Sequence, residues 1–205
     1  MDSRLVPLNQ EPKIGPSIAT PDNGHGVFTV SCSTLINAPP QKCLEIVLDG
    51  PKYPDWNTFC TKVTIDHVPA STESKWDVPP ELKHLMTQEG ALFPDVEFQF
   101  DCVMKVGDAP RKTALRVNRL EAITQNGRKG YRVVWIMPGG NRWILRAERV
   151  QEFVVAEDGQ DRTEYSCYET FGGVLAYPTR AFVGGQVADG FGRWMDGLKK
   201  KAEEH

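Results

Sequence analysis

The sequence predicts an α+β domain in which a curved antiparallel sheet of seven strands wraps around a long C-terminal helix, with two short helices after the first strand. Three observations predict this class. Alternating hydrophobicity, typical of strands with one buried face, recurs through residues 96–172. Turn signals at 107–110, 126–127 and 158–159 divide this region into consecutive hairpins. The final helical segment, 179–204, is long enough to fill the concave face of such a sheet.

The N-terminal region divides into an arm and the start of the folded domain. Residues 1–26 contain four prolines and three glycines without apolar periodicity, so we expect a flexible arm. The folded domain is then residues 27–205, and its first strand covers 27–36. Prolines 39 and 40 begin a first short helix, and residues 53–57 predict a second before a strand that ends at His67.

Residues 69–95 interrupt this pattern with four prolines around a short helix at 80–88. Connections longer than about 12 to 15 residues are uncommon unless they act as lids or are disordered. Two interpretations stay open: a lid over a binding site, or a solvated surface loop.

The C-terminal helix contains five glycines, each of which costs about 1 kcal/mol relative to alanine in a helix interior. Either the glycines let the helix approach the sheet closely, or they leave space above the helix that a ligand can fill. They are Gly184, Gly185, Gly190, Gly192 and Gly197.

Composition and charge exclude several classes of protein. A net charge of -3 lacks the basic excess that nucleic-acid binding requires. Apolar runs are too short to span a bilayer and the first residues do not resemble a secretory signal, so we expect no membrane span and a cytoplasmic location. The five cysteines form no Cys-x-x-Cys pair and are expected to be buried free thiols. The four histidines have no metal-binding spacing.

Three short motifs carry a family resemblance: Ala38-Pro39 at the start of the first helix, Tyr-Pro-Asp-Trp-Asn at 53–57, and Glu-Thr-Phe-Gly-Gly at 169–173. With this order of elements, residues 27–203 resemble the START-like, or SRPBCC, helix-grip superfamily. Members include polyketide cyclases and dehydratases, lipid and quinone carriers, and plant pathogenesis-related ligand binders. The resemblance implies an internal apolar cavity and a hydrophobic small molecule as partner.

Charged residues on the inward face of the last two strands are candidate catalysts. Alternation places Arg149 and Glu169 in the interior, where charges must be paired or shift their pKa. Arg149 could hold a carboxylate, a thioester carbonyl or an enolate while Glu169 moves protons. The alternatives are a structural ion pair and a register in which both side chains face outward. His67, at the end of the second strand, is a candidate general base or a rim histidine.

Aromatic and apolar residues at inward positions are candidate substrate contacts, although core packing uses the same residue types. For Trp56 the alternative to substrate contact is a structural role, in which its ring fills the core beneath the helices. The candidates are Trp56, Asn57, Phe98, Phe100, Tyr131, Trp135, Trp143, Tyr165, Val187 and Phe191.

The sequence therefore favours a cofactor-independent cyclase or dehydratase that closes a ring in a linear polyketide-like chain by aldol or lactone chemistry. A catalytic triad, a phosphate loop and a dinucleotide motif are all absent from the sequence, which argues against hydrolase, kinase and dehydrogenase activities and against a cofactor. Two alternatives are a non-catalytic carrier of a lipid, quinone or other apolar metabolite, and a subunit-binding module that uses the sheet edge or the insertion.

Overall fold

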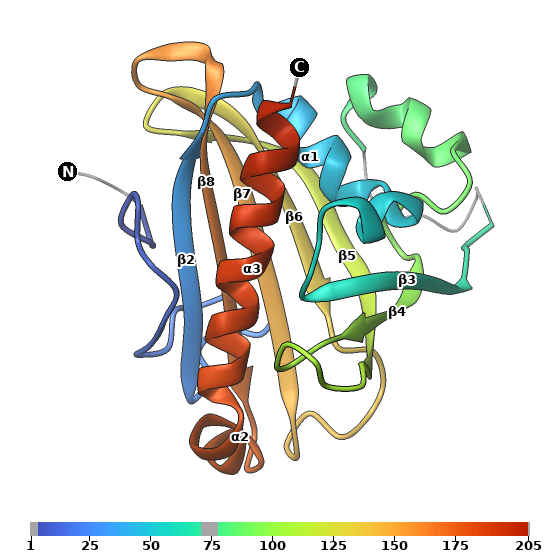
Figure 1. Ribbon diagram of the computed structural model, residues 1–205, viewed down its shortest axis with the longest axis vertical. Helices are drawn as coiled ribbons and strands as arrows, with labels where there is room; N and C mark the ends of the chain where they lie inside the picture. The colour runs from blue at the N-terminus through green and yellow to red at the C-terminus, as the bar shows by residue number, and fades with distance from the viewer. Residues whose placement is uncertain (1–3, 71–77, 205) are drawn as a thin grey trace.

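The computed structural model describes residues 4–70 and 78–204. In these residues a single antiparallel sheet curves around the C-terminal helix α3 (Figure 1). The strand order is β1-β2-β8-β7-β6-β5-β4-β3. The predicted α+β helix-grip class is confirmed, with eight strands in place of seven.

The additional strand comes from the N-terminal segment, and the remaining elements follow the predicted order. The strands are β1 (Lys13–Gly15), β2 (Phe28–Ile36), β3 (Cys60–His67), β4 (Glu97–Cys102), β5 (Arg111–Gln125), β6 (Arg128–Ile136), β7 (Arg146–Ala156) and β8 (Gly159–Gly172). The helices are α1 (Pro40–Leu48), α2 (Ala176–Phe182), α3 (Gly184–Glu203) and the 3-10 helices η1 (Gly50–Asp55) and η2 (Pro80–Thr87). The two short helices predicted after the first strand are α1 and η1.

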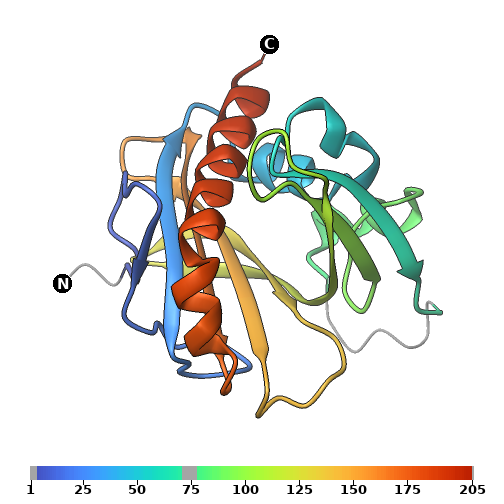
Figure 2. The same ribbon diagram turned by 60° about the horizontal axis from the view of Figure 1, so that its bottom comes forward.

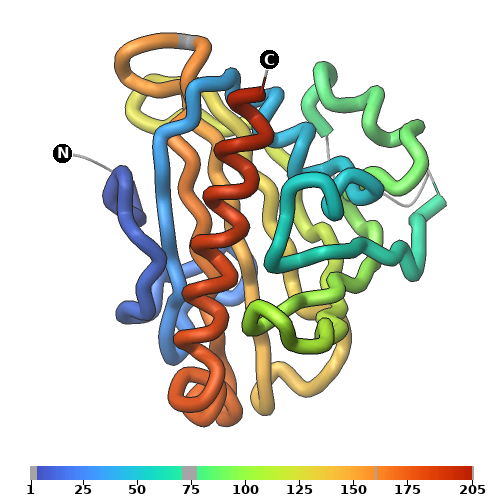
Figure 3. The backbone as a smooth tube through the Cα atoms, viewed as in Figure 1, coloured from blue at the N-terminus to red at the C-terminus, as the bar shows by residue number. Residues whose placement is uncertain are grey.

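The C-terminal helical segment is two helices, which corrects the prediction of one uninterrupted helix over 179–204. Val183 leaves the helical conformation, with φ at -124°, while its N–H still closes the last turn of α2 on the Thr179 carbonyl. Helix α3 then runs for 20 residues to the end of the molecule opposite α2 (Figure 3).

Two glycines of α3 lie where the helix meets its neighbours most closely. A Cβ at Gly197 would lie 2.2 Å from the Trp56 carbonyl oxygen, and one at Gly190 would lie 2.4 Å from the Phe59 ring. No atom lies within 4 Å of the equivalent position at Gly185. Close approach therefore explains Gly190 and Gly197, and it offsets their cost in helix propensity.

The space between α3 and the concave face of the sheet is filled by aromatic side chains. The Trp194 ring lies 5.3 Å from Trp56, 5.8 Å from Phe100 and 5.7 Å from Trp135, each in an edge-to-face arrangement that aromatic pairs favour. All five cysteines are buried free thiols, as predicted. Burial raises the pKa of Cys43 to about 11, which keeps that thiol protonated.

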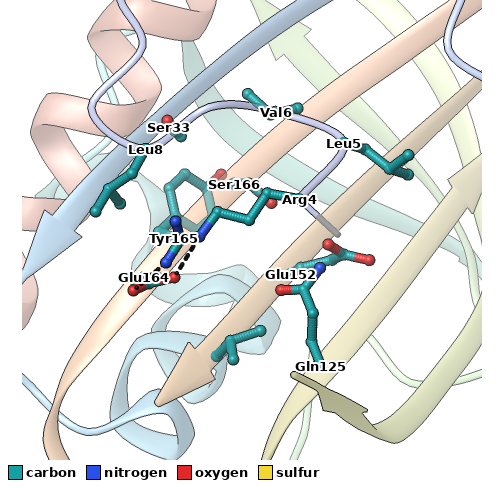
Figure 4. Close-up of a pocket in the computed structure, with 11 residues that line it drawn as sticks. Arg4, Leu5, Val6, Leu8, Ser33, Gln125, Glu152, Glu164, Tyr165 and Ser166 are labelled. Atoms are coloured by element: carbon teal, nitrogen blue, oxygen red, sulfur yellow. Dashed lines mark hydrogen bonds and ion pairs between the residues drawn. The ribbon is translucent and has the colours of Figure 1, made fainter. Parts of the chain in front are cut away.

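The N-terminal segment packs along the convex face of the sheet. Val6 and Thr20 are buried, and Arg4 donates to both carboxylate oxygens of Glu164 at 3.0 Å (Figure 4). Residues 4–26 are therefore a packed part of the domain here, which corrects the expectation of an arm without buried positions. The flexibility of this segment in solution stays a prediction.

Candidate functional site

An ion pair lies in the interior, between the sheet and α3. Arg149 on β7 is directly opposite Glu169 on β8, and its Nε and Nη2 donate to the same carboxylate oxygen, Oε2, at 2.9 and 2.8 Å. The two residues are 8% and 7% exposed. Apolar alternation along both strands therefore placed them correctly on the inward face.

The guanidinium of Arg149 is held from the helix side by two aromatic rings. Its Cζ lies 4.6 Å from the ring centre of Phe191 and 5.5 Å from that of Trp194. Burial alone would lower the pKa of Arg149, but the adjacent Glu169 carboxylate reverses this effect and raises the pKa above its ordinary value. Arg149 therefore stays charged and acts as a hydrogen-bond donor rather than as an acid.

Several buried donors around this pair lack an acceptor among the described residues. Trp135, opposite Arg149 on β6, and Trp194 on α3 both have an indole N–H without a partner. The amide nitrogen of Gln151, two residues along β7 from Arg149, also has no hydrogen-bond partner. A buried donor left unsatisfied costs about 1 to 3 kcal/mol, so such groups require an explanation. An oxygen-bearing ligand would supply the acceptors.

Gln151 extends the polar site along the inward face. Its Oε1 accepts a hydrogen bond of 2.8 Å from the Tyr165 hydroxyl on β8. Burial raises the pKa of Tyr165 well above its ordinary value, so this hydroxyl remains a donor near neutral pH. Arg149, Glu169, Gln151 and Tyr165 therefore form a polar strip in an otherwise aromatic interior.

A groove of about 420 Å³ opens at the end of the sheet where β5 and β6 join. Tyr131 and Glu81 meet at its edge, where the tyrosine hydroxyl donates to the carboxylate at 2.8 Å. Burial, aided by Glu81, raises the pKa of Tyr131 to about 12. The groove is lined by Pro39, Pro40, Gln41, Glu81, Ala122, Ile123, Thr124, Lys129, Gly130, Tyr131 and Val155.

The groove and the ion pair are separate positions on the same inward face. Tyr131 lies four residues before Trp135 on β6, and Trp135 is opposite Arg149. Four residues of a strand span roughly 13 Å. The pocket beneath the N-terminal segment (Figure 4) has only about 20 Å³, room for about one water molecule, and is too small for a metabolite.

Two predicted site residues lie outside the interior, and these placements are corrected. Trp143 is 83% exposed, because β7 begins only at Arg146 and the Trp143 N–H instead donates to Asn141 Oδ1 in a turn. His67 is exposed at the end of β3, where an irregular register after Ile65 changes the strand's alternation. Neither side chain meets Arg149 and Glu169.

The remaining candidates divide between the core and its margin. Asn57 is buried and its Oδ1 accepts from the backbone N–H groups of Phe59 and Cys60, which is a structural role in a turn. Val187 is half-buried and lies toward the N-terminal end of α3. The buried members of the set are Trp56, Phe98, Phe100, Trp135, Tyr165 and Phe191.

Sequence reasoning missed two contributors to the polar site. Gln151 shares the inward alternation of Arg149, so its position was visible in the sequence, but its unsatisfied amide was not. Trp194 belongs to the apolar stripe of the last helix, and only the structure shows its N–H without an acceptor among the described residues.

Within residues 4–70 and 78–204, no group of three His, Cys, Asp or Glu side chains is arranged to hold a metal ion. None of the helices in the same residues has the length and apolar character needed to cross a bilayer.

The antiparallel sheet wrapped around α3 is a helix-grip fold, the fold of START-like proteins. A hypothetical protein from Helicobacter pylori has a similar structure, with a TM-score of 0.57, 14% identity, and coverage of 85% of this chain and 88% of the other. A START superfamily protein from Mycobacterium smegmatis has a TM-score of 0.53 and 14% identity over 85% of this chain and 97% of its own. These similarities show the fold.

Sequence similarity defines the family more closely. No family model matches the chain. The chain is 30% identical over 167 residues to the oxopyrrolidines biosynthesis cluster protein O of Penicillium oxalicum, covering 77% of this chain and 78% of the relative. The chain therefore belongs to the same family as this biosynthesis cluster protein.

Proposed function

We propose that this protein is a cofactor-independent cyclase or dehydratase that closes a ring in a linear, carbonyl-rich metabolite. The observation that carries the proposal is the buried Arg149–Glu169 pair beside hydrogen-bond donors that lack acceptors. Carbonyl and enolate oxygens are acceptors only, so a chain with several carbonyl groups matches these donors chemically.

The reaction can be written with this chain's own residues. Glu169 removes a proton from a carbon between two carbonyl groups, and the enolate oxygen is held by the Arg149 guanidinium and an indole N–H. The enolate carbon attacks a second carbonyl of the same chain and forms the new carbon–carbon bond. The resulting alkoxide takes the proton back from Glu169, and loss of water from this aldol product would complete a dehydratase reaction.

The name of the Penicillium relative suggests a class of substrate. An oxopyrrolidine is a five-membered ring that contains one nitrogen and a ring carbonyl. A β-ketoamide whose nitrogen bears a carbonyl-containing substituent gives such a ring when its enolate carbon attacks that carbonyl. We therefore propose a linear β-ketoamide of this kind as the first substrate to test.

Entry to the pair requires the aromatic interior to open, because rings of Phe191 and Trp194 lie against Arg149. The groove is the proposed entrance, with η2 of the insertion as its cover. Leu82 and Leu85 of η2 are buried, whereas Glu81 reaches Tyr131 across the groove edge. Reduced hydrogen exchange in residues 80–87 on adding substrate would support this role, and unchanged exchange at saturation would contradict it.

The test of the function compares two glutamates of the sheet. Glu169→Gln keeps the side-chain volume but removes the base, so turnover of the β-ketoamide should fall about 10²- to 10⁴-fold while affinity is retained. Glu152→Gln is the matched control, because Glu152 is also buried but lies on the opposite face, bonded to Arg132 at 2.7 Å. Equal turnover by Glu169→Gln and the parent would disprove the catalytic role. Melting curves of both variants identify any loss of folding.

The carrier of an apolar metabolite is the second candidate, because the groove lies away from the ion pair. A carrier would bind the β-ketoamide or another apolar ligand and release it unchanged. Two results together would favour this function. The parent and Glu169→Gln would bind the ligand equally well, and the ligand would be recovered intact after incubation with the parent.

A further inference from the structure

The end of the molecule that contains α2 has an unusual concentration of exposed apolar side chains. Nine large apolar residues are exposed among those the structure describes, and six of them belong to this end. Such contiguous exposure is uncommon on a protein surface that has no partner. The six residues, called here the apolar end, are Trp143, Ile144, Val174, Leu175, Tyr177 and Phe182.

Two loops and a short helix hold the apolar end together. The backbone N–H groups of Val174 and Leu175 donate to the carbonyls of Trp143 and Ile144, both at 2.9 Å, which joins the loop before β7 to the start of α2. Gly173 allows this approach, since it has φ of +90° and a Cβ there would lie 2.6 Å from the Ile144 carbonyl oxygen. Both loops lie beside α2, at the end opposite the C-terminus (Figures 1 and 2).

The charge of these segments is the opposite of the charge of the whole chain. Residues 137–147 and 172–188 contain Arg142, Arg146 and Arg180 and no aspartate or glutamate, whereas the whole chain carries -3. Arg142 and Arg180 are exposed and Arg146 is half-buried. Arg142 also bonds to Asn23 of the N-terminal segment, and Arg146 to the His25 carbonyl.

We propose that the apolar end docks on a membrane surface that contains anionic lipids. Tryptophan, tyrosine and phenylalanine side chains suit the boundary between headgroups and acyl chains. Arginines beside them add attraction to anionic headgroups, each worth about fivefold in affinity. Phe182 and Trp143 are 80% and 83% exposed, so both side chains are free to insert without rearrangement of the fold.

Docking at this end would also place the membrane near the ion pair. Arg149 is three residues from the start of β7, and Glu169 is three residues from the end of β8. Both strand ends adjoin the apolar end. The docking inference stands on the exposed surface and does not depend on the proposed chemistry.

Vesicle binding tests this inference. The probe is unilamellar vesicles of phosphatidylcholine with about one third phosphatidylserine, compared with pure phosphatidylcholine, in a cosedimentation assay. The parent should bind the anionic vesicles more tightly. Trp143→Ser/Phe182→Ser should weaken binding by about tenfold or more, and Arg180→Gln by about fivefold. Val68→Ser and Lys83→Gln, at exposed positions elsewhere, are the matched controls and should bind like the parent.

Three results would overturn the inference. The parent could fail to sediment with either kind of vesicle, or the Trp143→Ser/Phe182→Ser variant could bind as tightly as the parent. The third result is a parent that forms a dimer in solution while this variant is monomeric. The apolar end would then be the interface with a second copy of the chain. Melting curves of the variants show whether the fold is kept, and Arg180→Gln provides a separate test that removes no apolar surface.

Discussion

On the convex face, the buried carboxylate of Glu148 accepts three hydrogen bonds: 2.7 Å from Thr20 Oγ1, 3.0 Å from the Asp22 N–H and 2.7 Å from the Asn23 N–H. On the concave face, both hydrogen bonds to Glu169 come from one guanidinium and reach only Oε2. Donors near Glu169 are unsatisfied at the same time. A fully satisfied buried network stabilises the fold, whereas a partly satisfied one requires an explanation, and the explanation proposed for the donors beside Arg149 is a ligand.

Unsatisfied buried nitrogens also occur in two arginines of the sheet, but there the rest of the guanidinium group is hydrogen-bonded. Arg128 and Arg116 on the strands each have a buried nitrogen without a partner in the described residues. Their guanidinium groups are nevertheless bonded through another nitrogen, Arg128 to the Val155 carbonyl and Arg116 to Asn118. The side chains of Trp135 and Trp194 each have only one donor, the indole N–H, and that donor has no acceptor in the described residues.

The largest expected effect on stability comes from removing one member of the Arg149–Glu169 ion pair. Arg149→Met leaves Glu169 buried without its partner and should lower the free energy of unfolding by about 3 kcal/mol. Replacing both residues by Met removes the unpaired charge and should recover most of this loss. Urea unfolding of the two variants measures the difference. A double variant as unstable as the single one would show that the pair is a structural requirement of the fold.

The next largest effect on stability is expected from substituting a glycine near the C-terminal end of α3, with a glycine near its N-terminal end as the comparison. Gly197→Ala should lower the free energy of unfolding by about 2 kcal/mol, because its Cβ would meet a backbone carbonyl that cannot move away easily. Gly185→Ala is the matched control, since its Cβ meets no atom within 4 Å and alanine is a better helix former. Equal stability of the two variants would refute the close approach of α3 to Trp56.

The contact between the N-terminal segment and the convex face should contribute less. Thr20→Val removes one of the three donors to Glu148 without changing volume greatly, and should cost about 1 kcal/mol in the free energy of unfolding. Thermal or urea unfolding measures the loss. If the variant were as stable as the parent, the hydrogen bond from Thr20 to Glu148 would contribute nothing to stability.

The smallest expected effect is a pH dependence that arises from Glu148. Burial raises the pKa of this carboxyl above its ordinary value of 4.5, although the Thr20 bond opposes the shift. The stability associated with the shift is present below pH 4.5 and is lost as pH rises through the raised pKa. Glu148→Gln cannot titrate, so the parent should lose stability relative to the variant as the pH rises above 4.5. Parallel melting temperatures across this range would contradict the shift.

The sequence predicted the fold well because alternation is a local property. Strands β5, β6 and β8 and the inward positions of Arg149 and Glu169 all follow from period-two patterns and turn residues. Strand β1 was missed because a three-residue strand has too few residues to show a pattern. The outward position of Trp143 depends on the Asn141 turn, which ends the alternation before the strand begins.

The site was predictable only in part, for a related reason. Residue type and strand face identify a buried charge, as they did for Arg149. Whether a donor such as Trp194 Nε1 finds an acceptor depends on groups from several elements, which no spacing along the chain specifies.

The central claim is that the unsatisfied donors beside Arg149 receive the oxygens of a carbonyl-rich ligand, and tryptophan indole resonances report on it most directly. Indole N–H signals of the ¹⁵N-labelled protein, assigned through single Trp→Phe variants, are followed during titration with a 1,3-diketone that has a medium-length alkyl chain. The indole signals of Trp135 and Trp194 should shift downfield as their N–H groups gain acceptors, while that of exposed Trp143 stays in place. Saturable binding that leaves both interior signals unchanged would contradict the claim.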